Sequence, residues 1–218
     1  MQARYEDGAE FRWLNKKVLN SRVLDSMEDL SAWSFTGAGE MILTDVHAKD
    51  GRHSLRIRST TSVAQVGGSG EWDLVATRKF PGEDWCPYNR ISLWVYADVM
   101  GAPAISCSLI LHNDGSHKLP DPYNEGRHES IILKNHMWNH VVWEIAPLNR
   151  DRITALDFAH SLPKKFPDPG DQTILDIDQL EFGVVIPDGT LSERSESHRE
   201  RNPPVFIGHN PGPLYSLS

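Results

Sequence analysis

Hydrophobic and polar residues alternate with period two along most of the chain between residues 40 and 184. This alternation is typical of strands with one buried and one exposed face, and helical periodicity never persists for three turns. Gly, Pro, Asn and Asp separate the alternating segments, as expected for turns. We therefore expect strands at residues 40–46, 54–60, 73–80, 90–98, 104–112, 128–134, 138–145, 153–159 and 174–184.

This strand pattern predicts an all-β fold, a two-sheet antiparallel β-sandwich with jelly-roll topology. A chain of 218 residues is long enough to bury the core of one such domain. We assign residues 1–21 to an N-terminal extension and residues 22–218 to the sandwich domain. Within that domain, the run at 187–204 is too charged to pack a core, so we interpret it as a surface excursion before a final strand near residues 205–209.

Tryptophans inside the expected strands are interpreted as packing residues rather than ligand contacts. In the segment 90–98, the alternation places Ser92, Trp94 and Tyr96 on the face opposite the core residues. Trp138 and Trp143 also lie within an expected strand. We therefore expect all three tryptophans to pack in the core or on a sheet face.

Charge and composition exclude some classes of partner. The chain has 22 Lys and Arg residues against 30 Asp and Glu residues, a net charge of −8, and no long basic run. Nucleic acid is therefore not an expected partner. No apolar stretch approaches the roughly 18 residues that span a bilayer, so membrane insertion is not expected. Cys86 and Cys107 lack metal-site spacing; we favour two buried thiols, with one disulfide as the alternative.

Five segments occur in a familiar order: VLDSMEDLSAWSF (23–35), KDGRHSLRIRS (49–59), YNRISLWVYAD (88–98), WNHVVWEI (138–145) and LDIDQLEFGV (175–184). In this order they resemble the galactose-binding-like jelly rolls of carbohydrate-binding modules attached to polysaccharide-degrading enzymes. The resemblance implies a non-catalytic module that binds polysaccharide or oligosaccharide. It also implies an attached or associated catalytic domain, and a secreted, periplasmic or cell-surface location.

The same resemblance implies a structural calcium ion. Glu28 matches the acidic residue of the opening MED segment, and Asp178 matches the aspartate of the closing strand; Asp25 and Asp50 are weaker matches. Calcium prefers six to eight oxygen ligands in flexible geometry, which carboxylates and turn carbonyls supply. The alternative is that these carboxylates cap turns or face solvent.

Candidate sugar-binding residues lie in loops that combine aromatic and polar side chains. A sugar site needs exposed rings that stack on the pyranose and polar groups that bind its hydroxyls. The stacking candidates are Trp72, Trp85, Tyr88 and Tyr123, and the hydrogen-bonding candidates are His112, Asn113, Asp114 and Arg127. For each aromatic residue the alternative is packing under a loop, and for Trp85 above all.

Two other functions remain open at this stage. The segment DIDQLE (176–181) can be compared with the Glu-x-Asp-x-x-Glu strand of laminarinase-like glycoside hydrolases, which would make Asp176 and Glu181 the catalytic pair of a hydrolase or lyase. Against this, period-two alternation points Glu181 away from Asp176 unless a bulge intervenes. The second alternative is a structural domain that packs on a catalytic partner and binds no sugar.

Overall fold

The computed structural model describes residues 18–60, 74–100, 105–114, 127–145, 148–160 and 170–185. These residues form the strands β1 (Val18–Asp25), β2 (Trp33–Gly37), β3 (Glu40–Thr44), β4 (Ser54–Thr60), β5 (Leu74–Glu83), β6 (Arg90–Val99), β7 (Ile105–Asn113), β8 (Arg127–Leu133), β9 (Met137–Glu144), β10 (Ile153–His160) and β11 (Gln172–Val185). Among the described residues, no helix is long and apolar enough to cross a membrane.

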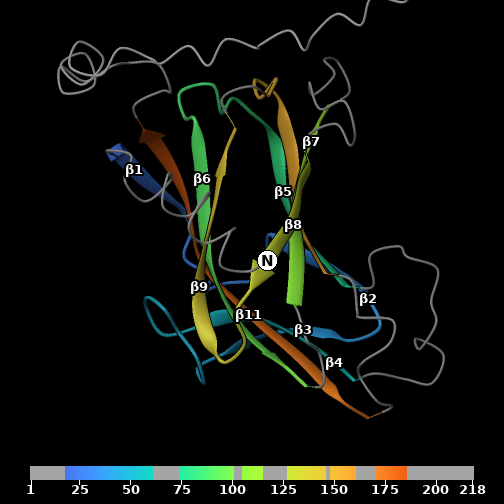
Figure 1. Ribbon diagram of the computed structural model, residues 1–218. Coiled ribbons are helices and arrows are strands. Elements are labelled where there is room, and N and C mark those ends of the chain that lie inside the picture. Colours follow the sequence, from blue (N-terminus) through green and yellow to red (C-terminus); the bar gives the residue numbers. More distant parts are fainter. Residues whose placement is uncertain are drawn as a thin grey trace, which may run out of the picture. The chain divides into compact units, whose positions relative to one another are not determined.

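The strands form two antiparallel sheets that pack face to face as a jelly-roll sandwich (Figure 1). One sheet has the order β3-β4-β11-β6-β9, with β1 paired to β11 as its sixth strand. The other sheet has the order β2-β5-β10-β7-β8. In Figure 1 the strands β6 and β9 of the first sheet stand opposite β7 and β8 of the second. The predicted all-β sandwich is therefore confirmed.

The inward-facing residues of both sheets form one hydrophobic core, as the alternation predicted. In β6, Leu93 and Val95 are buried, whereas Trp94 and Tyr96 on the other face are half-exposed. Phe158 of β10 is buried on the opposite sheet. Removing such side chains from water supplies the main stabilising free energy of the fold.

The sequence-predicted strand bounds agree with the structure except at the N-terminal end. The strands β1 and β2 were not predicted, and Val18–Asp25 begins four residues before the expected start of the domain at residue 22. Almost every residue of β1 is exposed, so no alternating pattern marks it in the sequence. The expected excursion at 187–204 and the strand near 205–209 lie outside the described residues.

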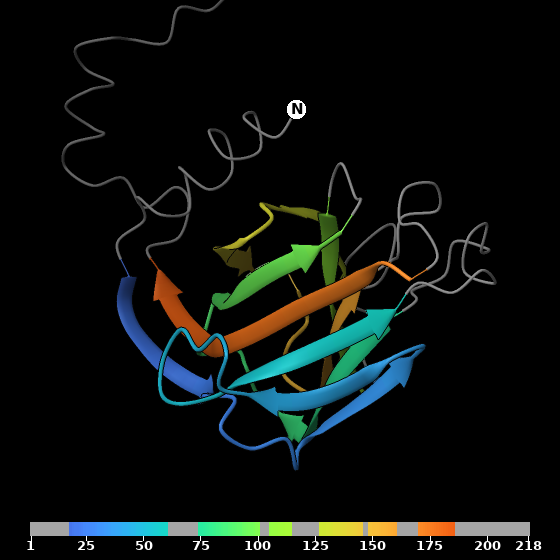
Figure 2. The ribbon, with the colours of Figure 1, turned by 90° about the horizontal axis from the view of Figure 1, so that it is seen from below.

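β11 contains a bulge that divides it into two halves. Gln179 has a φ of +51°, an uncommon conformation for a residue other than glycine, and the pairing with β6 shifts register between Asp178 and Glu181. The first half pairs with β4 and the second half with β1. The bend is visible in Figure 2, where β11 is orange and β1 is dark blue.

Both cysteines are free thiols. Cys107 lies in the core, and burial raises the pKa of its thiol. Cys86 is exposed, because it lies in the turn between β5 and β6. The preference for two free thiols over a disulfide is confirmed, whereas the expected burial of Cys86 is wrong.

Candidate functional site

The outer face of the five-stranded sheet presents mostly polar side chains, together with Ala155 and Ile110, across its three central strands. We call this surface the polar face; its side chains are those of Thr77 and Lys79 on β5, Ala155 and Asp157 on β10, and Ile110 and His112 on β7. Strand alternation places them outward, because their sequence neighbours Phe80, Leu156, Phe158 and Leu111 are buried in the core.

Asp157 organises the centre of the polar face. Its carboxylate accepts a hydrogen bond from Thr77 Oγ1 at 2.7 Å and pairs with His112 Nε2 at 2.7 Å. The His112 side chain is 46% exposed and that of Asp157 only 15%. The hydrogen bond to Asp157 raises the pKa of His112, so the imidazole is more readily protonated than in free solution.

A second ion pair lies at the end of the same strands. Arg152 Nη1 is 3.2 Å from Asp114 Oδ2, and the Arg152 side chain is 58% exposed against 33% for Asp114. In both pairs the cationic group reaches further into solvent than the carboxylate. A ligand approaching this surface therefore meets the donors first.

Of the predicted stacking residues, Trp85 packs in the core, which was the alternative stated for it, and Tyr88 has one ring face against the core. Trp85 is buried and contacts Phe80 and Phe182 edge to face, at 4.9 Å and 4.6 Å between ring centroids. Tyr88 is half-buried and stacks on Phe182 at 4.4 Å. Their assignment to a ligand site is not supported, because these contacts place Trp85 and one face of the Tyr88 ring against the core.

Of the other predicted ligand residues, His112 and Asp114 project from the end of β7 at the polar face, and Asn113 lies between them, half-buried. The Asn113 carbonyl accepts a hydrogen bond from Thr154 Oγ1. Arg127 begins β8, and its backbone pairs with that of Ile110, but its side chain is not among the described ones. Trp72 and Tyr123 lie outside the described residues. The prediction for those three side chains stays a prediction.

The outer face of the six-stranded sheet differs from the polar face because it carries aromatic rings, two of which contact the loop between β3 and β4. We call it the covered face; its rings are those of Trp94 and Tyr96 on β6 and Trp138 and His140 on β9. His140 stacks on Trp94 at 4.4 Å, and Tyr96 contacts Trp138 edge to face at 5.8 Å.

Residues 45–53, the covering loop between β3 and β4, lie against these rings. Lys49 Nζ is 4.0 Å from the centre of the Trp94 ring, and the His47 ring is 3.9 Å from that of Tyr96. A cation over an indole is attracted by the ring quadrupole. Trp94 therefore contacts both His140 and Lys49.

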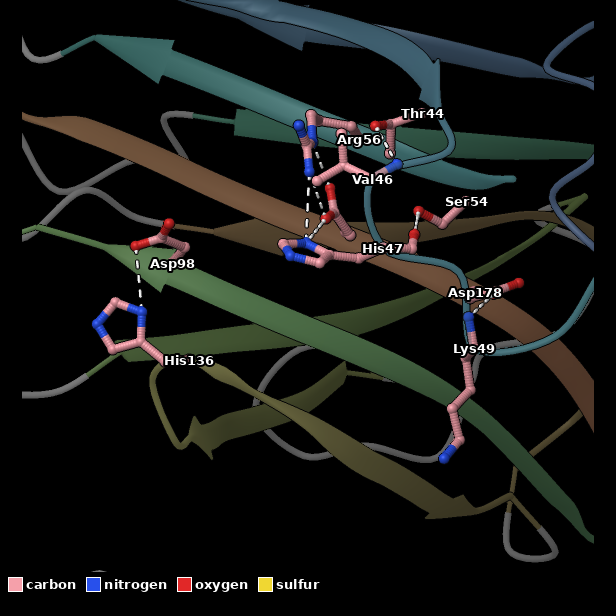
Figure 3. Close-up of polar contacts among 10 residues, drawn as sticks. Thr44, Val46, His47, Lys49, Ser54, Arg56, Asp98, His136 and Asp178 are labelled. Atoms are coloured by element: carbon pink, nitrogen blue, oxygen red, sulfur yellow. Dashed lines mark hydrogen bonds and ion pairs between the residues drawn. The ribbon is translucent and has the colours of Figure 1, made fainter. Parts of the chain in front are cut away.

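A buried carboxylate beneath the covering loop holds the loop to the sheet. Asp176 of β11 is fully buried and forms a two-bond ion pair with Arg56 of β4, each N···O distance being 2.7 Å. His47 Nδ1 lies 2.7 Å from the same carboxylate. Figure 3 shows Arg56 and His47 side by side, joined by a dashed line. Parallel N–H···O bonds of this kind combine charge with fixed geometry.

Two of the carboxylates expected to bind calcium, those of Asp178 and Glu28, accept hydrogen bonds from the covering loop. Asp178 Oδ2 accepts the backbone N–H groups of Lys49 and Asp50 at 2.6 Å and 3.0 Å, and Glu28 Oε1 accepts those of Arg52 and His53 at 2.6 Å and 3.0 Å. Both therefore fasten the covering loop.

Asp25 is instead committed to Arg78, at 2.7 Å, and to the Trp33 indole N–H, at 3.0 Å, while Asp50 is an exposed residue. Within the described ranges, no three His, Cys, Asp or Glu side chains are grouped as a metal site.

The two carboxylates of the loop differ in pKa. The amide of Arg52 and then the His53 ring, both donating hydrogen bonds, lower the pKa of Glu28 to about 2. Burial raises the pKa of Asp178 despite three backbone N–H donors, and the nearby charge of Asp50 adds to this rise. The pKa values of the two carboxylates differ because Asp178 is buried and has N–H donors but no cationic partner among the described residues, whereas Glu28 also has the His53 ring.

The bulge in β11 tests the hydrolase alternative. It turns Glu181 to the same face as Asp176, because Asp176 pairs with Tyr96 and Glu181 with Ser92, which share the outer face of β6. The bulge, named above as the exception to the alternation, is therefore present and brings Glu181 to the face of Asp176. Four residues of strand separate the two positions, roughly 13 Å, whereas glycosidase carboxylates stand about 5–9.5 Å apart. Asp176 is also buried in its ion pair, so these two residues do not form a catalytic site here.

Sequence reasoning missed Asp157, Thr77 and Lys79 on the polar face. The pattern ITALDFA (153–159) already sets Ala155, Asp157 and Ala159 against Leu156 and Phe158, so an inspection of the outward set would have found a carboxylate between two alanines. Its partner His112 is 45 residues away in sequence. No local pattern identifies such a pair.

Comparison with known proteins places the fold. No family model matches the chain, and no curated protein sequence matches it. Among solved structures, a family 11 carbohydrate-binding module from Clostridium thermocellum, in complex with a β-1,3-1,4-mixed-linked tetrasaccharide, is similar with a TM-score of 0.50 and 12% identity, over 78% of this chain and 99% of that one. The fold is thus that of a β-sandwich carbohydrate-binding module.

Two further structures from Clostridium thermocellum are also similar. A family 11 module of a cellulosomal cellulase gives a TM-score of 0.49 at 11% identity, over 78% of this chain and 97% of the other. A family 22 module gives a TM-score of 0.43 at 18% identity, over 82% and 99%.

Proposed function

We propose that this chain binds polysaccharide or oligosaccharide without catalysing its cleavage, and that it does so on the polar face. The observation that carries the proposal is the row of Thr77, Asp157 and His112, which crosses three adjacent strands at the solvent. Such a row on a rigid sheet offers donors and acceptors for sugar hydroxyls along an extended ligand. The fold, shared with a module solved in complex with a tetrasaccharide, supports the same function.

The test is retardation of the purified chain in native gels that contain plant, algal or host polysaccharides, with reducing ends measured in parallel. We expect retardation by at least one glycan without new reducing ends. His112→Gln should reduce the retardation, while His140→Gln on the covered face should leave it unchanged. New reducing ends, or retardation that survives His112→Gln but not His140→Gln, would contradict the proposal.

A biological setting follows from this function. A non-catalytic glycan binder is useful where it holds a polysaccharide close to an enzyme, because linking two binding events raises the effective local concentration. We propose that the chain works in a secreted, periplasmic or surface system that degrades polysaccharide, with an attached or associated catalytic domain. Co-purification of a glycoside hydrolase or lyase with the native protein would support this, and its recovery alone from the cytoplasm would contradict it.

Exposed apolar side chains favour a second candidate, a structural domain that packs on a partner. Val23 on β1, Ile42 and Leu43 on β3, and Val46 in the covering loop are exposed by 36–64%. Edge-strand apolar surface of this kind is typical of contact with another protein. A chain that binds no glycan, but forms a complex with a catalytic domain that Ile42→Lys abolishes, would support this candidate.

Calcium is a separate proposal, supported by the uncompensated charge of Asp178. We propose that a calcium ion binds beside Glu28 and Asp178 and stabilises the covering loop. In the structure each carboxylate is engaged by N–H groups, so the ion has to replace some of these donors with loop carbonyl oxygens.

Melting temperature measures this directly. After EDTA treatment, adding millimolar calcium should raise the melting temperature of the wild type and not of Glu28→Gln, and magnesium should have little effect. An unchanged wild-type melting temperature would contradict calcium binding and leave the hydrogen bonds as the fastening of the loop.

A further inference from the structure

A positively charged row crosses the polar face beside Asp157. In the pairing of the sheet, Lys79 on β5 and His112 on β7 both lie opposite Ala155 on β10. All three side chains face outward, and Ala155 has the shortest of them. Because neighbouring strands are about 4.8 Å apart, the backbones of the two basic residues are roughly 10 Å apart with a gap above Ala155 between them.

The positive charges of this row are available to a ligand. Lys79 is exposed, and no described residue pairs with its ammonium group. His112 uses Nε2 for Asp157, so Nδ1 is the ring nitrogen that the protonated imidazole has left to donate to a ligand. Arg152 extends the same surface by one more exposed cation.

The negative charges lie deeper. The carboxylate of Asp157 is satisfied by Thr77 and His112 and is only 15% exposed, and the Asp114 carboxylate is less exposed than the guanidinium it binds. This surface therefore presents cations to solvent although the whole chain carries a net charge of −8. Local potential, rather than net charge, determines which ligands accumulate at a surface.

We propose that the polar face is selective for acidic glycans, with a uronate carboxylate held above Ala155 between Lys79 and His112. This inference rests on the proposed glycan-binding function and names its substrate class. A carboxylate in that gap accepts one hydrogen bond from the Lys79 ammonium and one from the His112 imidazolium, and charge-assisted bonds are stronger than neutral ones. Asp157, held by Thr77 and His112, then keeps the imidazole in place beside the bound carboxylate.

The experiment compares two ligands that differ only in charge: polygalacturonate and its methyl-esterified form, each titrated into the full chain by calorimetry at pH 6. We expect the acidic form to bind roughly tenfold more tightly, about 1.4 kcal/mol. The preference should fall with added salt, because exposed charges are screened, and should weaken as the pH rises through the pKa of His112.

Variants assign the effect to the row. Lys79→Gln should remove most of the preference and leave binding of the esterified form nearly unchanged. His112→Gln should remove the preference as well and also weaken binding of both forms, because His112 belongs to the row that binds the glycan. Arg58→Gln is the matched control, because it removes one exposed cation from the six-stranded sheet, where Arg58 pairs with Glu40. An equal loss of preference in Arg58→Gln would overturn the assignment, since it would mean that only overall charge matters.

Further outcomes separate this inference from the function on which it rests. Equal affinity for the acidic and esterified forms would overturn the inference while leaving glycan binding intact. The same titrations compare dextran sulfate with dextran. If the gain in affinity from sulfate exceeds the gain from the uronate carboxylate, the polar face selects sulfate rather than uronate, and the inference is overturned. Failure to bind any glycan, charged or neutral, would overturn both proposals together.

Discussion

The two outer faces of this sandwich carry similar residues in different surroundings. Each carries a histidine beside a buried or half-buried carboxylate: His112 with Asp157 on the polar face, and His47 with Asp176 on the covered face. On the polar face the imidazole is the outermost group and is open to solvent. On the covered face a loop lies over the aromatic rings, and the carboxylate is fully buried with Arg56.

This difference concerns how accessible the side chains of each face are. Trp94, Tyr96 and Trp138 form the more conspicuous surface, yet Lys49, His47 and His140 already occupy faces of two of these rings. The polar face has no described aromatic residue in its central strands, but its hydrogen-bonding groups are accessible. Availability, rather than residue type, distinguishes a binding surface from a packing surface.

The largest expected effect on stability comes from removing the buried ion pair of the covered face. Asp176→Asn leaves Arg56 buried without its countercharge, so we expect a loss of about 3–5 kcal/mol in the free energy of unfolding, measured in urea. Asp114→Asn, the same change in an exposed pair on the other sheet, should cost less than about 1 kcal/mol. The double variant Asp176→Leu/Arg56→Met should recover most of the loss. Equal costs for the two single variants would contradict the distinction between the faces.

A smaller effect concerns the covering loop at Gly51. Its φ of +66° disfavours any side chain, at about 1–2 kcal/mol, and an added Cβ would lie 2.2 Å from Glu28 Oε1. Gly51→Ala should therefore destabilise the chain by about 2 kcal/mol or more and displace Glu28.

Gly82→Ala is the control, because Gly82 also has a positive φ, +85°, but open space around its Cβ position. Urea unfolding of the two variants should differ by the cost of moving Glu28. Equal destabilisation would mean that the contact between Glu28 and the loop contributes nothing measurable.

His140 sharpens the comparison through pH. Burial, and then the charges of Arg90 and Lys49, lower the pKa of His140 to about 4. Since the unfolded chain then binds more protons between pH 6.5 and 4, stability contributed by neutral His140 is lost as the pH falls through that window. After allowance for solvent reaching the ring, we expect about 1–2 kcal/mol. His140→Gln should flatten that part of the stability profile; an unaltered slope would contradict it.

The smallest expected effect has the opposite sign, on the polar face. The pKa of His112 is raised by its bond to Asp157, so its stabilising contribution is present below pH 6.5 and is lost as the pH rises through the folded-state pKa. NMR titration of the His112 ring should give a pKa above 6.5, and Asp157→Asn should return it toward that value. A His112 pKa below that of His140 would contradict the contrast between the faces.

Much of this fold is readable from the sequence, and the reasons for the failures are physical. The central strands were predicted because each has one face in the core, so Leu93 and Val95 alternate with Trp94 and Tyr96. β1 was missed because pairing with the far end of β11, rather than burial, makes it a strand. Trp85 was wrongly included among the stacking residues, because the sequence of a polar loop does not show whether its tryptophan points inward or outward.

The candidate site was only half predictable for a related reason. His112 and Asp114 were predicted because they end a strand before a long polar segment, where binding residues often lie. Their partners Asp157 and Arg152 come from the neighbouring strand β10, and register between distant strands cannot be derived from local spacing. The orientation of Glu181 depended on whether β11 contains a bulge, which the sequence left open; Gln179 supplies it and reverses the alternation for the rest of the strand.

The divided strand β11 also determines how the domain can fold. Its two halves pair with β4 and β1 on one side and with β6 on the other, so β1, at residues 18–25, finds its partner only at residues 180–185. During synthesis the six-stranded sheet therefore stays incomplete until nearly the whole described chain has been made. Contacts this far apart in sequence slow folding and leave strand edges exposed in the meantime, which makes the nascent chain dependent on prompt completion of its last strand.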